Sequence, residues 1–185
     1  QVLEMESRFD ILGEADDPLY MFDVNRPVNQ RSARLHGWEI GGQYFFGDTG
    51  FGVLANYTIV KGDVGIDRAA DPGADVFALT GLSDTANLVL MYEKYGWSAR
   101  LAWNWRDKYL LAANQNGNNR NPYFVEAYDQ IDLSVAYSFN DKLTLSLEVI
   151  NLTGEDIRWH ARSKNQMVRL VDQEPRYMLG LRYEF

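Results

Sequence analysis

The sequence predicts an all-β protein, an antiparallel meander of about seven long transmembrane strands that forms part of an outer-membrane β-barrel. The first observation is the segment 175–185, where apolar or aromatic side chains occupy every second position up to the final residue, Phe185. Side chains alternate between the faces of a strand, so this segment has one apolar face. Six further segments alternate in the same way, and short turns alternate with long loops between them. A soluble sheet gains little from an exposed apolar edge, whereas a barrel in lipid needs an apolar outer face and an aromatic rim.

Composition narrows the class of protein. The chain has 185 residues, a formal net charge of −8 and no cysteine. The negative charge argues against nucleic-acid binding, which needs basic patches over phosphates, and disulfides and thiolate metal sites are excluded. No apolar run approaches the roughly 18 residues of a membrane-spanning helix. We expect no signal peptide within these residues, because no charged and apolar leader pattern follows Gln1.

The predicted strands are long and regularly spaced. We expect them over 36–46, 51–61, 85–94, 97–109, 127–139, 142–151 and 175–185. Residues 1–33 are expected to be mostly loop, with Val2 and Leu3 as the end of an earlier strand. The outward aromatic side chains of these strands are assigned to a girdle and a lipid-facing surface: Tyr57, Trp97, Trp103, Trp105, Tyr109 and Tyr137.

The connections between these strands alternate in length. Short turns are expected at 47–50, 95–96 and 140–141, and long loops at 62–83, 110–126 and 153–174. Outer-membrane barrels have short periplasmic turns and long extracellular loops, so we expect the C-terminus on the periplasmic side. A soluble β-sandwich is the alternative, but sandwich strands are usually near 5–6 residues long, shorter than these.

The predicted number of strands, seven, is odd. An open sheet of seven strands would leave two unpaired edges in a bilayer, which lipid does not tolerate, and bacterial single-chain barrels use even counts. We therefore expect residues 1–185 to be the C-terminal portion of a longer polypeptide.

Several short motifs, taken in order, resemble one family. They are Arg34–Glu39 with its G-x-E strand opening, Gly81–Leu88 followed by Tyr92-Glu93, Arg100-Leu101 to Tyr109, the corner Asn151-Leu152-Thr153, and the ending Gly180–Phe185. Their order and spacing resemble those of TonB-dependent receptors over about residues 25–185.

The resemblance implies an energy-coupled importer of the Gram-negative outer membrane, with a barrel of about 22 strands and a plugged lumen. Its implied partners are outer-membrane lipid, a small-molecule ligand, the barrel-assembly machinery and the TonB system, the last through a plug domain. The plug domain and the N-terminal strands are not among residues 1–185. No nucleic acid, cofactor or metal is expected. A passive porin-like channel is the alternative function, and an outer-membrane barrel enzyme is less favoured because His36 and His160 lie far apart and no nucleophile motif is present.

Three sets of residues are predicted to carry function. An assembly signal resembling the one read by the barrel-assembly machinery comprises Tyr177, Leu181, Tyr183 and Phe185. The polar residues expected to line the lumen are Glu39, Arg100, Asn104, Arg106, Asp132, Glu148 and Arg182. The loop residues expected to contact the ligand are Trp159, His160, Tyr123, Phe124, Asn114, Asn116, Asn118, Arg120 and Arg158.

The chemistry of the loops leaves the ligand open. Amide-rich loops suit a hydroxyl-rich ligand such as an oligosaccharide, because amides both donate and accept hydrogen bonds. The cations Arg158, Arg162 and Lys164 suit an anionic ligand such as a ferric siderophore. Four aspartates at four-residue spacing, from Asp63 to Asp75, are interpreted as a solvated acidic loop. A hard-cation site is the alternative, because Ca²⁺ takes several oxygen ligands, but the glycine and glutamate pattern of an EF-hand is missing.

Overall fold

The computed structural model describes residues 2–7, 20–25, 32–71, 77–113 and 121–185, and these fall into two units, 1–32 and 33–185. The first unit contains an antiparallel hairpin of β1 (Val2–Ser7) and β2 (Tyr20–Asn25), with Val2 opposite Asn25 and Ser7 opposite Tyr20. The prediction that Val2 and Leu3 lie in a strand is confirmed, whereas the expected loop was wrong for the rest of β1 and for β2.

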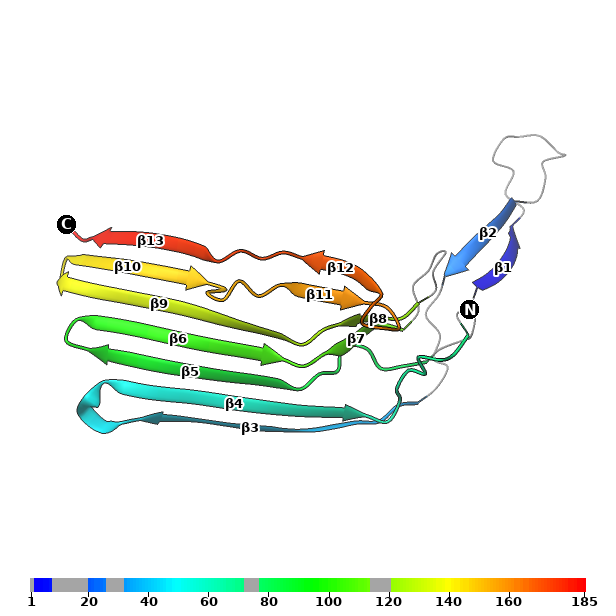
Figure 1. Ribbon diagram of the computed structural model, residues 1–185, viewed down its shortest axis with the longest axis horizontal. Coiled ribbons are helices and arrows are strands. Elements are labelled where there is room, and N and C mark those ends of the chain that lie inside the picture. Colours follow the sequence, from blue (N-terminus) through cyan, green and yellow to red (C-terminus); the bar gives the residue numbers. More distant parts are fainter. Residues whose placement is uncertain (1, 8–19, 26–31, 72–76, 114–120) are drawn as a thin grey trace. The chain divides into compact units, whose positions relative to one another are not determined.

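The second unit is built on a seven-stranded antiparallel sheet (Figure 1). Its strands, in spatial order, are β3 (Leu35–Phe45), β4 (Phe51–Gly62), β5 (Thr85–Lys94), β6 (Trp97–Arg106), β9 (Tyr128–Asn140), β10 (Leu143–Ile150) and β13 (Arg176–Tyr183). Each lies beside its neighbour in the predicted meander, which confirms the predicted fold class. The predicted strand 97–109 ends earlier than expected, at Arg106.

A second, four-stranded sheet lies next to the seven-stranded sheet, at the end where the long loops were predicted. It contains β7 (Tyr109–Ala112), β8 (Tyr123–Val125), β11 (Ile157–His160) and β12 (Met167–Val171). Its order, β12-β11-β8-β7, repeats the order β13-β10-β9-β6 of the larger sheet (Figure 1). Each short strand is the neighbour in sequence of the long strand at the same place in the order, and a few unpaired residues separate the two. The prediction of loops over 110–126 and 153–174 was therefore wrong for the parts of these ranges that form β7, β8, β11 and β12. The pairing is favoured because it satisfies backbone groups that already lie side by side.

The short turns have the chemistry that their strands require. Tyr95 and Gly96 both have positive φ angles, 54° and 77°, which is the pattern of a two-residue type I′ hairpin turn. A Cβ on Gly96 would meet the Ser138 carbonyl oxygen at 2.8 Å, so close approach of the next strand also requires glycine there. In the turn after β9, Asn140 Oδ1 accepts hydrogen bonds from the backbone N–H groups of Lys142 and Leu143. A single 3₁₀ turn, η1 (Gly47–Thr49), joins β3 to β4.

The strand register places the apolar side chains on one face. One row crosses all seven strands in direct pairing: Tyr44, Val53, Leu90, Leu101, Leu133, Val149 and Tyr177. Because successive residues alternate between faces, the remaining apolar positions of each strand follow this row. We call this surface the apolar face and the opposite one the polar face.

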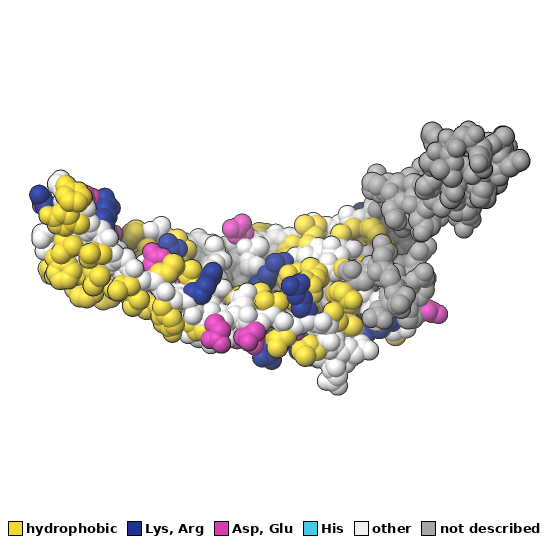
Figure 2. All heavy atoms as spheres, turned by 90° about the horizontal axis from the view of Figure 1, so that it is seen from above, with side chains coloured by type: hydrophobic (Ala, Val, Ile, Leu, Met, Phe, Trp, Pro, Cys, Tyr) yellow, Lys and Arg dark blue, Asp and Glu magenta, His cyan; other side chains and the backbone are white. Residues whose placement is uncertain are grey.

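The apolar face is exposed over most of its length, although Val149, in the row that crosses the sheet, is 2% exposed. Leu181 is 71% exposed and Trp38 is 74% exposed on the two edge strands, and Leu101 in the middle of the sheet is still 38% exposed. In a sandwich, a second sheet would bury such side chains. The sandwich alternative is therefore wrong for the part of the chain that the structure describes. At the short-turn end, hydrophobic side chains gather along one side of the sheet (Figure 2).

Two groups of aromatic side chains border the apolar face. At the short-turn end, rings pair at centroid distances of 4.7–5.2 Å: Phe51–Tyr92, Trp97–Tyr137, Tyr137–Phe139, Tyr44–Phe46 and Tyr183–Phe185. At the other end of β6 lie Trp103 and Trp105. At about 3.3 Å per residue, Trp97 and Trp105 are about 26 Å apart along the strand, close to the height of the lipid-facing band of an outer-membrane barrel. Among the described residues, no helix is long and apolar enough to cross a membrane.

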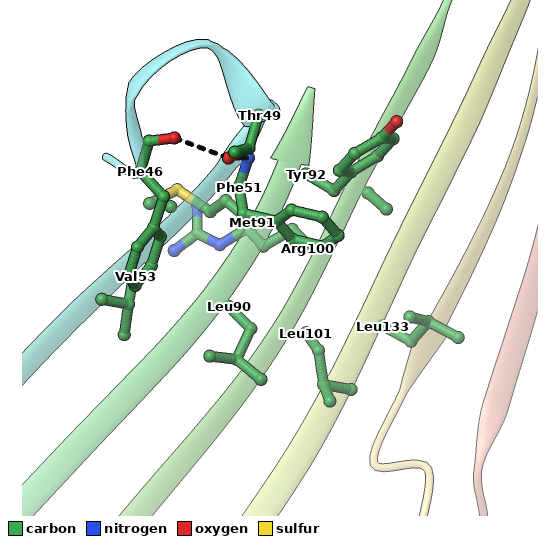
Figure 3. Close-up of a pocket in the computed structure, with 12 residues that line it drawn as sticks. Phe46, Thr49, Phe51, Val53, Leu90, Met91, Tyr92, Arg100, Leu101 and Leu133 are labelled. Carbon is green, nitrogen blue, oxygen red and sulfur yellow. Dashed lines mark hydrogen bonds between the residues drawn. The ribbon is translucent and has the colours of Figure 1, made fainter. Parts of the chain in front are cut away.

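A shallow hollow of about 670 Å³ lies at the short-turn end of β4, β5 and β6 (Figure 3). The rings of Phe46, Phe51 and Tyr92 border it, and the small side chain of Ala99 leaves its floor open. Thr49 Oγ1 donates a hydrogen bond to the Phe46 carbonyl, and this contact holds the turn beside the hollow. The hollow is thus part of the apolar face.

The polar face carries all seven residues that were predicted to line the lumen, since each occupies a position adjacent in sequence to an apolar-face residue. Arg100, Ser134 and Glu148 lie directly opposite one another on neighbouring strands. A hollow of about 580 Å³ on this face includes Arg100, Asn104, Asp132 and Glu148 in its lining. Whether this face borders a lumen stays a prediction.

Candidate ligand-binding site

The four-stranded sheet has a small buried core of its own. Phe124 and Val125 of β8 are 6% and 4% exposed, and His160 of β11 is 3% exposed. The Phe124 and His160 rings stack with centroids 5.2 Å apart and planes 14° apart, because β8 and β11 pair these two residues directly. The sequence prediction treated both as loop side chains open to a ligand, but both are packed within the chain.

His160 links the buried core to a charged cluster. Its Nδ1 lies 2.6 Å from the Ala161 carbonyl oxygen, and its Nε2 lies 2.9 Å from Glu126 Oε1. The Nε2 contact is short but lacks hydrogen-bond geometry, so this buried nitrogen has no hydrogen-bond partner among the described residues. The other Glu126 oxygen lies 3.0 Å from Lys164 Nζ.

A hollow of about 610 Å³ opens beside this cluster. Its lining comes from β11 and from the segments before β9, after β10 and around β12: Glu126, Ala127, Glu155, Asp156, Arg158, Trp159, His160, Lys164 and Met167. Three carboxylates face two permanent cations, so the lining has no excess of positive charge. Such a surface suits a ligand with donors and acceptors in similar number better than a strongly anionic one.

Trp159 supplies the only aromatic surface besides His160 among the described residues that line the hollow. The Arg169 guanidinium lies 5.0 Å from the Trp159 ring, opposite it on β12, and restrains the indole. Arg158, with a side chain that is 65% exposed, lies 4.0 Å from Asp156 at the rim. An ion pair with so exposed a cation adds little stability, so Arg158 is available to a ligand, whereas Asp156 is 24% exposed and its Oδ1 already accepts a hydrogen bond from the Gln173 N–H.

The structure brings together only some of the predicted ligand contacts. Trp159, His160 and Arg158 line the hollow, whereas Phe124 lies beneath His160 and Tyr123 is half-buried on β8. Asn114, Asn116, Asn118 and Arg120 lie outside the described residues. The sequence prediction missed the carboxylates Glu126, Glu155 and Asp156. They converge only because β8 pairs with β11, and no local pattern signals that pairing.

Comparison with known families identifies the architecture. The family model described as "TonB dependent receptor-like, beta-barrel" matches residues 9–152, most of the chain. The chain belongs to the TonB-dependent receptor family. Its members are receptors of the Gram-negative outer membrane and not enzymes. The outer-membrane location agrees with the exposed apolar face of this receptor. Neither the comparison with curated proteins nor the one with solved structures gave a match.

The motif 81–87 of this TonB-dependent receptor forms hydrogen bonds with neighbouring strands near their ends. Gly81 has a φ of 77°, its N–H donates to the Leu110 carbonyl, and its own carbonyl accepts from Arg106 Nη2. Ser83 Oγ donates to the Asp107 carbonyl. At the end of the motif, Asn87 Nδ2 donates to Asn56 Oδ1 across the β4–β5 pair. Ser83 and Asn87 therefore each join neighbouring strands.

Asp84, in the same motif, extends the β4–β5 ladder with its side chain. Its Oδ1 accepts a hydrogen bond from the Val60 N–H, and its Oδ2 lies 3.2 Å from Lys61 Nζ. The backbone hydrogen bond from Val60 is the main cause that lowers the pKa of this carboxyl, and Lys61 adds to it against the opposing effect of burial. The carboxylate is therefore held in its charged form.

The corner Asn151-Leu152-Thr153 turns the receptor chain from β10 toward β11. Asn151 is 3% exposed and has a φ of 56°. Its amide Nδ2 donates to the carbonyls of Glu155 and Gln173, its Oδ1 accepts from the Glu155 N–H, and its own N–H donates to Asp132 Oδ1. The corner thus ties β10 to the segment that leads from β12 into β13.

Two of the spaced aspartates accept hydrogen bonds from backbone N–H groups. Asp63 Oδ1 accepts the Arg34 N–H, and Asp67 Oδ1 accepts the Ala69 N–H. Asp75 lies outside the described residues. Within the described ranges, no group of three or more histidine, cysteine or acidic side chains could hold a metal ion.

Proposed function

We propose that this receptor imports a small-molecule ligand across the outer membrane with energy from the TonB system. In this proposal, residues 1–185 are the C-terminal portion of a larger barrel whose plug domain lies elsewhere in the polypeptide. The support comes from the sheet itself: β3 and β13 each have one neighbour among the described strands, and a bilayer requires both edges to be paired. The apolar face would meet lipid, and the polar face would line the lumen.

We further propose that the short turns face the periplasm. The asymmetry in connection length supports this, because the turns after β3, β5 and β9 are short while the arms at the other end carry the second sheet. The C-terminus lies at the short-turn end, since Tyr183 pairs with Leu143 directly after the β9–β10 turn (Figure 1). The hollow beside Trp159 would then open to the outside of the cell.

For the ligand, we propose a neutral, hydroxyl-rich molecule such as an oligosaccharide in preference to a ferric siderophore. The observation that carries this choice is the lining of the hollow, in which three carboxylates outnumber two cations next to an indole ring. Hydroxyl groups can donate to the carboxylates and accept from Arg158 and Lys164, and an indole offers a flat apolar surface to a sugar ring. An anionic ligand would meet net repulsion there.

The test uses the full-length receptor in its outer membrane, with labelled neutral oligosaccharides and ferric siderophores as probes. We expect binding of an oligosaccharide, TonB-dependent uptake, and a loss of affinity of about tenfold or more in Trp159→Ala, because aromatic burial contributes about 1.5–3 kcal/mol. Trp38→Ala makes the same truncation on the apolar face and is expected to bind normally. Binding of siderophores alone would reject the ligand class, and uptake without TonB would reject the receptor function.

The assembly role of the last strand stays a proposal. Leu181 and Tyr183 lie on the apolar face with Tyr177, and Tyr183 and Phe185 rings meet edge-on at 5.2 Å. We expect deletion of Phe185 to lower the amount of receptor assembled in the outer membrane without lowering its synthesis. An unchanged ratio of assembled to total receptor would count against this role.

A further inference from the structure

The segment 63–71, which we call the strap, leaves the end of β4 and lies against the four-stranded sheet. Its base is fixed to the chain before β3, since the Arg34 N–H donates to Asp63 Oδ1 and the Asp63 N–H donates to the Arg34 carbonyl. Its tip is a turn in which the N–H groups of Ala69 and Ala70 donate to the side chain and carbonyl of Asp67. The strap therefore has a defined shape.

Arg162, which lies between β11 and β12 and far from the strap in sequence, holds the tip of the strap. Its Nη1 donates to the carbonyl of Arg68 at 2.8 Å and to the carbonyl of Ala70. Its Nε donates to Asn121 Oδ1 at 2.9 Å. One guanidinium thus joins three segments: the strap, the chain before β8 and the turn between β11 and β12. Only arginine has several donors in a rigid planar fork that can serve such an arrangement.

The strap also contacts the four-stranded sheet through Arg68. The Arg68 guanidinium lies 4.3 Å from the centre of the Phe124 ring. Phe124 stacks on His160, and His160 lines the hollow beside Glu126. The strap therefore contacts Phe124, and Phe124 contacts a residue of the candidate ligand site, His160.

The attachment of the strap tip is polar. Asp67, Arg68 and Ala69 are exposed, and the contacts that hold them are hydrogen bonds and one cation–π contact. A segment held in this way opens locally at much lower free energy than the sheet beneath it unfolds.

We propose that the strap is a retractable closure over the Phe124 side of the four-stranded sheet, and that Arg162 is the positioning residue that holds it shut. Release uncovers Phe124 and removes the cation that restrains the stack under His160. The link between strap opening and ligand occupancy rests on the proposed ligand site, whereas the closure itself does not.

The experiment measures strap opening without any ligand. Folded full-length receptor is treated with a low trypsin concentration, and the rate of cleavage after Arg68 is followed by mass spectrometry of the fragments. We expect Arg162→Gln to be cleaved there at least about fivefold faster than the unmodified receptor, because the cleavage rate follows the population of the open segment. Arg162→Lys should behave similarly, since an ammonium group cannot reproduce the fork.

Two further variants make the result decisive. Asn121→Ala removes one of the three partners and should give a smaller acceleration, and it serves if Arg162 variants do not assemble. Arg169→Gln removes the arginine beside Trp159, which does not touch the strap, and should leave cleavage after Arg68 unchanged. Equal rates in Arg162→Gln and the unmodified receptor, or equal acceleration in Arg169→Gln, would overturn the proposal. Since no ligand is present, either outcome leaves the proposed uptake function untouched.

Discussion

Asn151 shows how one side chain can fix the direction of a chain at the end of a strand. Its left-handed φ is tolerated by asparagine better than by most residues, because the short amide bonds locally. Four hydrogen bonds satisfy the buried side chain and backbone N–H together. A carbonyl or N–H left without its partner at this site would cost far more than the mean value of a hydrogen bond.

Substitution of Asn151 tests this account. We expect Asn151→Leu to lower the free energy of unfolding by about 3 kcal/mol, because buried backbone groups lose their partners and leucine is strained at positive φ. The measurement is the temperature or denaturant concentration at which the receptor loses its compact, gel-stable form. Asn151→Gly separates the two causes, since it removes the three side-chain hydrogen bonds, keeps the backbone N–H bond to Asp132, and relieves the strain.

The neighbouring Thr153→Ala, at an exposed position of the same corner, is the matched control and should behave like the unmodified receptor. If Asn151→Gly were as stable as the unmodified receptor, the hydrogen bonds would contribute nothing and only the backbone conformation would matter. Asn151→Asp keeps the acceptor but aims an oxygen at two carbonyls, so it should be destabilised as well.

At the scale of the element, the long strands were predictable and the short ones were not. A period of two sustained over about ten residues, as in 97–106, leaves few alternatives, and the strands of the large sheet were predicted for this reason. β8 has three residues and β11 has four, too few for a period to emerge. Their pairing depends on the alignment of the long strands next to them in the chain, β9 after β8 and β10 before β11.

The same limit explains the mixed outcome at the candidate site. Trp159 and Arg158 were predicted as ligand contacts from residue type and loop position, and they do line the hollow. His160 has the same sequence context, yet its pairing with Phe124 buries it. Alternation alone cannot tell which face of a three- or four-residue strand is covered.

The polar face also holds an element-scale detail that periodicity does not reveal. Phe45 pairs with Gly52, and a Cβ on Gly52 would lie 2.7 Å from the Phe45 ring. The ring thus covers the backbone of a residue that has no side chain, an arrangement that supports glycine in sheets. Phe45 is 59% exposed, so the polar face carries one exposed aromatic ring near the turn between β3 and β4.

At the scale of the whole molecule, the two faces of the sheet should respond in opposite ways to the same charge. Leu101 and Ala102 are neighbours in β6, midway between Trp97 and Trp105, and they point to opposite faces. We expect Leu101→Lys to destabilise the receptor by about 2–4 kcal/mol and to lower the assembled amount, because lipid cannot solvate an ammonium group near the bilayer centre.

Ala102→Lys is the matched control, because it adds the same side chain one residue away on the face that already carries Arg100, Asn104 and Asp132. Water and neighbouring polar groups can solvate the charge there, so we expect assembly and stability close to those of the unmodified receptor. The measurement is the folded fraction in purified outer membranes and its unfolding temperature in bilayers of defined composition. If both lysines were tolerated equally, or if Ala102→Lys were the worse of the two, the apolar face would not be the surface that meets lipid. The proposed import function would then lose its structural basis.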